Sequence, residues 1–81
     1  MPTKAQHSRR YQRLQRLLRA TREEAGLTQR DLAGRLRKTQ AWVWKCETSE
    51  RRVDLAEFCD WCEACGSDPI AMVRRFVRDE P

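Results

Sequence analysis

Apolar side chains recur every three or four positions along most of this chain, which is the period of an amphipathic helix. In residues 9–25, arginines occupy the polar faces and the other face carries Tyr11, Leu14, Leu17, Leu18, Thr21 and Ala25. Gly26 is expected to end this helix, because glycine readily adopts the positive φ that follows a last helical turn. Apolar and polar residues alternate nowhere over a useful length, so the sequence predicts an all-α protein.

Two short helices are predicted next, over residues 28–36 and 39–47. Thr28 is placed to cap the first helix, and Asp31 is its capping-box partner. Thr39 is placed to cap the second helix in the same way. The positions expected to point inward from the two helices are Leu32, Ala33, Leu36, Val43 and Cys46.

The start signal repeats after the polar stretch 48–52, where Asp54 caps a fourth helix and Glu57 completes its capping box. Gly66 is expected to end that helix, and Ser67 or Asp68 is expected to cap a fifth. The apolar positions expected to be buried are Leu55, Phe58, Cys59, Cys62 and Cys65 in the fourth helix, and Ile70, Val73, Phe76 and Val77 in the fifth.

This pattern predicts one domain, a compact five-helix bundle over residues 9–81, after a flexible N-terminal segment of residues 1–8. A chain of 81 residues has too little interior for both a core and a large catalytic pocket. No nucleophile and base are paired in the sequence. We therefore expect no catalytic residues and no cofactor.

Charge is distributed unevenly along the chain, which has a formal net charge of +5. Residues 1–22 carry seven basic and no acidic side chains, whereas residues 53–81 carry three basic and seven acidic ones. This asymmetry predicts a polyanionic partner that binds in one orientation, because the basic part of the chain attracts it and the acidic part repels it. The arginines of the first helix either extend the surface that contacts this partner or form a solvated face. No signal peptide, transmembrane run or lipidation motif is visible, so we expect no membrane partner and a cytoplasmic location.

Three of the four cysteines, Cys59, Cys62 and Cys65, recur every three residues and project from one side of the fourth helix. A disulfide between neighbours on one helix constrains little, and a zinc site needs four ligands in tetrahedral geometry. The spacing resembles no zinc finger. Core packing is therefore the favoured interpretation, with metal binding and redox sensing as alternatives.

The pair of short helices joined by a tight turn has the layout of a helix-turn-helix. A helix of this diameter fits the major groove of B-form DNA, where the side chains of its first turns reach base edges. Each of the two helices begins with threonine followed by glutamine, at Thr28-Gln29 and Thr39-Gln40. Glutamine both donates and accepts hydrogen bonds, so it suits a phosphate or the edge of adenine.

Residues 17–69 resemble the helix-turn-helix domain of the lambda-repressor and Cro-like superfamily, also called the Xre family. The resemblance is carried by LRATREEAGLTQRDLAGRL (18–36), TQAWVWKCE (39–47) and ERRVDLAEF (50–58). It implies a lambda-repressor-like five-helix fold, a Cro-type transcriptional regulator such as a repressor, and a homodimer on a two-fold site in double-stranded DNA.

The resemblance also implies roles for individual residues. Gln29 is similar to the glutamine that clamps a phosphate, beside the cap Thr28. The positions around the recognition helix that match DNA contacts are Lys38, Thr39, Gln40, Ala41, Trp44, Lys45, Arg51 and Arg52. Arg22 and Glu47 match a pair that forms a structural salt bridge. The chain departs from the family at Arg37 or Lys38, where glycine is frequent in the turn.

The tryptophans leave a second class of function open. Trp42 is expected to be half-buried, whereas Trp44 is expected to contact DNA, contact a protein or fold back onto the domain. Trp61 and Met72 are expected either to line a dimer interface or to fill the edge of the core. The rival to a DNA-binding regulator is therefore a protein-interaction module, antitoxin-like or polymerase-associated, with Trp44 and Trp61 as anchors.

Overall fold

Five α-helices follow one another in the computed structural model, which describes residues 8–48 and 50–78. They are α1 (Arg9–Glu24), α2 (Gln29–Leu36), α3 (Gln40–Glu47), α4 (Leu55–Ala64) and α5 (Pro69–Arg78). No strand occurs in those residues, so the predicted all-α five-helix fold is confirmed. Most of the expected flexible segment, residues 1–7, lies outside the described residues. Ser8 is the N-cap of α1, and its hydroxyl accepts a hydrogen bond from the Tyr11 N–H at 3.0 Å.

The predicted start and stop signals lie at the observed helix ends. Thr28 and Asp31 form a capping box at α2, and Asp54 and Glu57 form another at α4. A carboxylate oxygen of Asp68 accepts a hydrogen bond from the Ile70 N–H at 3.1 Å, at the start of α5. Gly26 and Gly66 both have a φ of +74°, a conformation that glycine adopts without strain. The helix bounds therefore follow from local signals.

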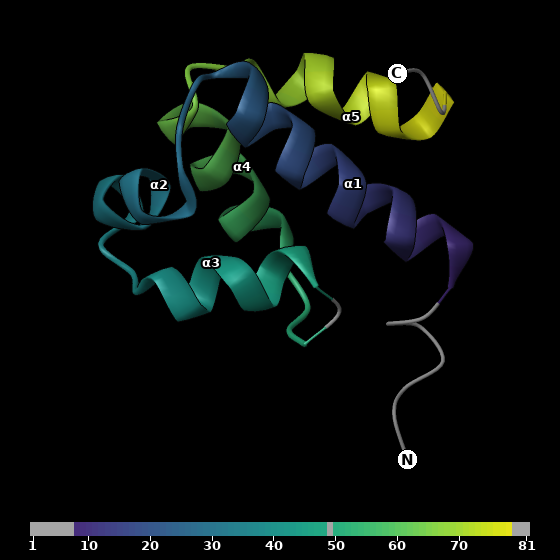
Figure 1. The fold of residues 1–81 in the computed structure, drawn as a ribbon. Coiled ribbons are helices and arrows are strands. Elements are labelled where there is room, and N and C mark those ends of the chain that lie inside the picture. The colour runs from purple at the N-terminus through teal and green to yellow at the C-terminus, as the bar shows by residue number, and fades with distance from the viewer. Residues whose placement is uncertain (1–7, 49, 79–81) are drawn as a thin grey trace.

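Helix α4 occupies the middle of the bundle and packs against α1, α2 and α5. Helices α1 and α5 lie side by side along one edge of the molecule, and α3 lies along the opposite edge (Figure 1). Helix α3 also packs against α2 and α1. The arrangement leaves one long side of α3 at the molecular surface.

Trp61 is the largest fully buried side chain of the core, and its indole Nε1–H donates a hydrogen bond to the Leu18 carbonyl at 3.0 Å. Of the two alternatives for Trp61 and Met72, an interface or the core, the structure supports the core, and the expected role of Trp61 as an anchor for a protein partner is wrong. Trp61 lies on the same face of α4 as Phe58 and Cys65, and this face turns toward the rest of the core. The other fully buried side chains are Leu18, Leu32, Val43, Cys46 and Cys62.

Several apolar positions that were expected to be buried are exposed instead. Ala25, which the periodicity placed on the apolar face, is the C-cap after Glu24 and is exposed. Leu55 is 72% exposed, and α5 contains no buried residue. Helix α5 packs on the core through Met72 and Phe76, while Ile70, Val73 and Val77 lie on the side of the helix next to that contact and remain exposed.

Tyr11 fixes the segment between α3 and α4. Its hydroxyl accepts a hydrogen bond from the Val53 N–H at 2.9 Å and donates one to the Arg51 carbonyl at 3.4 Å. The Arg52 guanidinium lies 4.5 Å from the centre of the Tyr11 ring. The N-terminal part of α1 thereby holds the loop that follows α3.

Candidate nucleic-acid interface

The turn between α2 and α3 sets the geometry of the two short helices. Arg37 is the C-cap of α2 and has left-handed backbone angles, with φ of 57° and ψ of 41°. The Lys38 N–H donates a hydrogen bond to the Ala33 carbonyl at 2.9 Å, which closes the end of α2. The next residue, Thr39, accepts a hydrogen bond from the Trp42 N–H at 3.1 Å and starts α3. Arg37 thus takes the conformation for which the family often uses glycine.

Helix α3 turns one face to the core and the other to solvent. Val43 and Cys46 are completely buried. The four residues predicted to read bases, Gln40, Ala41, Trp44 and Lys45, are all exposed. Trp44 is 47% exposed, so it lies at the surface rather than in the core. The structure therefore brings the predicted reading positions together on one accessible helical face.

The starts of α2 and α3 meet at a polar recess of about 500 Å³. Its lining consists of Arg22, Thr28, Gln29, Arg30 and Gln40. The first N–H groups of a helix have no partner within the helix, and the helix dipole favours negative charge there. The recess therefore offers amide, guanidinium and hydroxyl groups of a kind that bind phosphate oxygens.

Arg30 is a residue that the sequence analysis did not select. It is exposed in the first turn of α2 and lines the recess. A cation at the N-terminus of a helix opposes the helix dipole, so an arginine there is more stable when an anion is bound. This mismatch between charge and helix end is the signal in the sequence that points to Arg30.

Glu47 connects α1, α2 and α3 beside the recess. Its carboxylate accepts hydrogen bonds from Arg22 Nε at 2.7 Å and from Arg22 Nη2 at 3.1 Å. Arg22 Nη1 also donates to the Leu27 carbonyl at 2.8 Å, and Gln29 Nε2 donates to Glu47 at 3.0 Å. The side chains of Arg22 and Glu47 are only 10% and 3% exposed. The hydrogen bond to Glu47 raises the pKa of Arg22, which favours the charged guanidinium.

Trp42 carries two cations on its ring. The Lys38 ammonium lies 5.2 Å and the Arg51 guanidinium 4.9 Å from the ring centre. On the inner side, the ring of Trp42 lies 6.3 Å from that of Trp61. Trp42 is half-buried, as predicted. Lys38 and Arg51 therefore lie beside α3, where they flank its exposed face.

Arg51 is more constrained than a free surface cation. Its guanidinium donates hydrogen bonds to both carboxylate oxygens of Glu57, at 2.9 and 2.8 Å, and one to the Arg52 carbonyl at 2.7 Å. About a third of its side chain, 34%, remains exposed. Arg52 is exposed beside Tyr11. Both arginines lie in the loop after α3, and the ion pair fixes the position of Arg51.

The thiols belong to the interior. Cys46, Cys62 and Cys65 are buried, and Cys59 is partly buried. Burial raises the pKa of the Cys46 thiol to about 11 and that of Cys62 to about 12. Within residues 8–48 and 50–78, no group of three or more histidine, cysteine or acidic residues has the geometry of a metal site. Burial of these thiols supports the core-packing interpretation.

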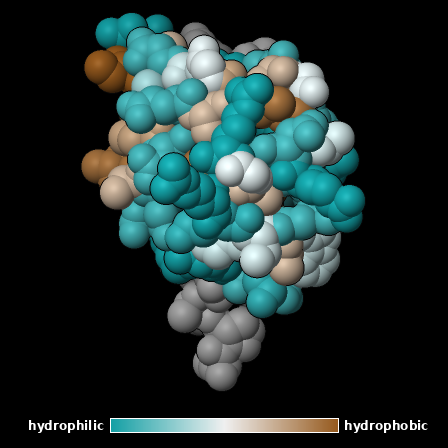
Figure 2. Space-filling model, turned by 90° about the vertical axis from the view of Figure 1, so that its left-hand side faces the viewer, coloured by the Kyte–Doolittle hydropathy of each residue, from teal (hydrophilic) through white to brown (hydrophobic). Residues whose placement is uncertain are grey.

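The side of the molecule that carries α2 in Figure 1 faces the viewer in Figure 2, where hydrophilic residues cover most of it. Hydrophobic atoms gather mainly at one edge of that view (Figure 2). Among the described helices, none is long and apolar enough to span a bilayer. The side of the molecule that carries α2 is therefore largely polar.

Comparison with known proteins adds an independent result. The family model of a helix-turn-helix domain matches residues 13–76. A solved structure, described as an XRE-family like protein from Pseudomonas syringae pv. tomato str. DC3000, is 44% identical to this chain. It superposes with a TM-score of 0.84 over 96% of this chain and 95% of its own. No curated protein matches the sequence significantly.

Proposed function

Because the chain belongs to the helix-turn-helix domain family and is Xre-like, we propose that it is a sequence-specific transcriptional regulator that reads duplex DNA through α3. Membership of this family supports a DNA-binding regulator at a general level. The proposal adds sequence specificity, the reading helix and a role in transcription. Together with free cysteines, this function implies a cytoplasmic protein.

The observation that carries the proposal is the accessible face of α3. Its first turn presents Gln40 and Ala41, and its second presents Trp44 and Lys45, all exposed. A helix inserted in the major groove contacts base edges with its N-terminal residues. Gln40 has the donor and acceptor pair that matches adenine, and Trp44 suits the methyl group of thymine or a sugar. Each good bidentate base contact discriminates by about 1–3 kcal/mol.

Phosphate contacts supply most of the affinity in this proposal. Gln29 and Arg30 line the recess at the start of α2, beside the cap Thr28. One amide hydrogen of Gln29 is used by Glu47, which orients the side chain and leaves its second N–H for a phosphate. Lys38, Arg51 and Arg52 extend the contact on the other side of α3, and Thr39 marks its start.

The regulator acts as a homodimer in this proposal, because a two-fold protein matches two half-sites one or more helical turns apart. Repression follows when such a site overlaps a promoter. A second copy needs a surface that leaves α3 free, and the apolar face of α5 meets this condition (Figure 1).

A second candidate function rests on Trp44, an exposed aromatic side chain of the kind that anchors protein interfaces. In that case α3 binds a protein, as an antitoxin-like or polymerase-associated module would. The burial of Trp61 removes the other anchor that was expected for such a module.

Selection of bound sequences from a random pool of duplex DNA tests the proposal. We expect a reproducible motif, and we expect Gln40→Ala to relax the preference at one base pair. Gln12→Ala, at an exposed position of α1, serves as the control that leaves the motif unchanged. Failure to enrich any motif, or the same motif with Gln40→Ala, would contradict the assignment of α3 as the reading helix.

A further inference from the structure

Helices α1 and α5 carry the whole net positive charge of the chain. They contain nine of its 17 basic residues and only two of its 12 acidic residues. The rest of the chain has eight basic and ten acidic residues, so its formal charge is negative. The nine basic residues are all arginines, and all but the buried Arg22 make up what we call the α1–α5 face. Such a concentration of like charge repels itself and attracts a polyanion.

Contacts between α1 and α5 hold these arginines together. Arg13 Nη2 donates a hydrogen bond to the Phe76 carbonyl at 2.9 Å, and the Arg13 guanidinium lies 5.4 Å from the centre of the Phe76 ring. The Arg10 guanidinium lies 5.9 Å from the centre of the same ring. Arg75 Nη1 lies 3.2 Å from a carboxylate oxygen of Glu24. The two helices therefore present their cations as one surface.

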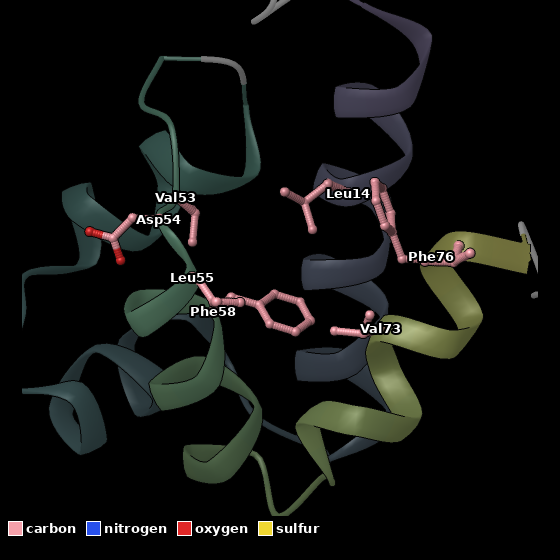
Figure 3. A pocket seen from close by; sticks show the side chains of 8 residues that line it. Leu14, Val53, Asp54, Leu55, Phe58, Val73 and Phe76 are labelled. Atoms are coloured by element: carbon pink, nitrogen blue, oxygen red, sulfur yellow. The ribbon is translucent and has the colours of Figure 1, made fainter.

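Four arginines of the α1–α5 face are available to a partner. They are the exposed residues Arg9, Arg16, Arg74 and Arg78. In residues 8–48 and 50–78, none of these four forms an ion pair. Val73 and Val77 line an apolar groove of about 340 Å³ between α4 and α5 (Figure 3), and the helical spacing places the two α5 arginines outside it. The basic surface is therefore separate from the apolar one.

We propose that the α1–α5 face binds the phosphate backbone of a second segment of duplex DNA, without reading its sequence. The guanidinium group of arginine matches two phosphate oxygens with parallel hydrogen bonds. Helix α1 has 16 residues and is about 24 Å long, which corresponds to about seven phosphates along one strand of DNA. Contacts to phosphates carry no base information, so this surface needs no defined sequence.

The duplex that contacts α3 does not itself reach this face. Helices α1 and α5 lie along the edge of the molecule opposite α3 (Figure 1), and the described residues extend over 31 × 28 × 19 Å. Duplex DNA has a persistence length of about 150 base pairs, so bending it back around a protein of this size is costly. The second segment is therefore another duplex or a distant part of the same DNA.

An anionic membrane fits the α1–α5 face less well. Helices that lie in the lipid headgroup region carry large apolar side chains beside their cations. The exposed positions of α1 carry Gln12 between Arg9 and Arg16, followed by Arg19 and Glu23. An acidic protein surface offers carboxylates to the same guanidinium groups, so competition with an acidic polypeptide distinguishes it from DNA.

This inference goes beyond the proposed function, because it concerns a surface that α3 does not use. The full chain is first saturated with the duplex selected through α3. Binding of a second, fluorescently labelled duplex of unrelated sequence is then measured by anisotropy, and we expect a complex that contains both duplexes. If selection yields no motif, the proposed function fails, and the labelled duplex alone still tests the α1–α5 face.

Two sets of variants assign each duplex to its surface. Replacement of all four exposed arginines by glutamine (Arg9→Gln, Arg16→Gln, Arg74→Gln and Arg78→Gln) is expected to weaken binding of the second duplex by at least about 10-fold at about 100 mM salt. Its affinity for the selected duplex is expected to stay unchanged. Lys45→Gln with Arg52→Gln, which removes cations on and beside α3, is expected to show the opposite pattern.

Circular dichroism checks that each variant is folded. Unchanged binding of the second duplex in the four-arginine variant overturns the proposal. A loss of the second duplex in Lys45→Gln with Arg52→Gln also overturns it, because the second duplex would then lie at α3 of another copy. Displacement of the labelled duplex by poly-L-glutamate at the same concentration of charge would assign the face to an acidic protein instead.

Discussion

Glu47, the last residue of α3, connects three helices through its side chain. One carboxylate accepts hydrogen bonds from Arg22 of α1 and Gln29 of α2, at distances of 2.7 to 3.1 Å. Arg22 in turn binds the carbonyl of Leu27, in the segment that leads into α2. The relative position of the three helices therefore depends on one buried charge.

Replacement of Glu47 by alanine is expected to lower the free energy of unfolding by about 3–5 kcal/mol, because Arg22 would remain buried without a counter-charge. Glu23→Ala is the matched control. Its pair with Arg19 has side chains 53% and 65% exposed and is worth only about 0.3–0.5 kcal/mol. Urea denaturation measures both values. Equal losses in the two variants would show that the Glu47 pair is not a buried one.

Glu57 gives the fold a dependence on pH. Hydrogen bonds from the Arg51 guanidinium, followed by one from the Asp54 N–H, hold the pKa of Glu57 below its usual value of 4.5. Between the folded and unfolded pKa values the unfolded chain binds more protons, so stability rises with pH in that range. The contribution is fully present above pH 4.5 and is lost as the pH falls through the lower, folded pKa.

We therefore expect the midpoint of urea denaturation to fall as the pH is lowered below 4.5, and to fall less steeply in Glu57→Gln. Glu63→Gln, an exposed acidic position on the same helix, is the control that keeps the wild-type slope. Identical pH profiles for the wild type and Glu57→Gln would show that protonation of this carboxylate does not contribute to the pH dependence of stability.

At the level of the elements, helix starts and stops follow from residues that are close in sequence. The threonine caps, the two capping boxes and the glycines at positive φ lie where the sequence predicts them. Each of these features joins groups no more than four or five residues apart, so no distant part of the chain has to be known. The turn position at Arg37 or Lys38 was instead indicated by the family resemblance, in which glycine is frequent there, and the structure assigns the positive φ to Arg37.

Arg37→Gly is expected to raise the free energy of unfolding by up to about 1 kcal/mol. Left-handed backbone angles destabilise a residue with a side chain by about 1–2 kcal/mol, and glycine removes this strain. Part of the gain is offset because glycine loses more backbone entropy on folding. Lys38→Gly, next to it at negative φ, is expected to give no gain. Thermal denaturation compares the two variants. A destabilised Arg37→Gly would mean that the arginine side chain contributes more than its backbone strain costs.

Helix α5 shows the limit of periodicity. The sequence correctly identified an apolar stripe along it, but the stripe is wider than the contact it makes. Met72 and Phe76 pack on the core, whereas Ile70 and Val77 remain exposed. The hydropathy pattern gives the angular width of an apolar face, but the placement of neighbouring helices decides which part of that face is covered.

For the whole molecule, several basic residues lie on or beside α2 and α3, namely Arg30, Lys38, Lys45, Arg51 and Arg52. Binding to duplex DNA is therefore expected to weaken by about 10³–10⁵-fold between about 50 and about 200 mM salt if six to ten phosphates are contacted. Arg30→Gln is expected to reduce the slope of log K against log salt by about 1. Fluorescence anisotropy measures this slope.

Arg35→Gln is the matched control, because Arg35 Nη1 donates to the Ala64 carbonyl at 2.7 Å and is directed toward α4. Its slope is expected to equal that of the wild type. A nearly flat salt dependence for the wild type would instead favour a protein contact centred on Trp44.

The sequence by itself determined the five helices, their caps, the turn between α2 and α3 and the outward face of α3. Short-range backbone hydrogen bonds and helical periodicity specify all of these. Only the tertiary structure decided that Trp61 is buried in the core, and that Glu47 holds Gln29 from 18 residues away. The groove between α4 and α5 is also a tertiary result. Its walls come from three helices, and their separation depends on packing across the whole core.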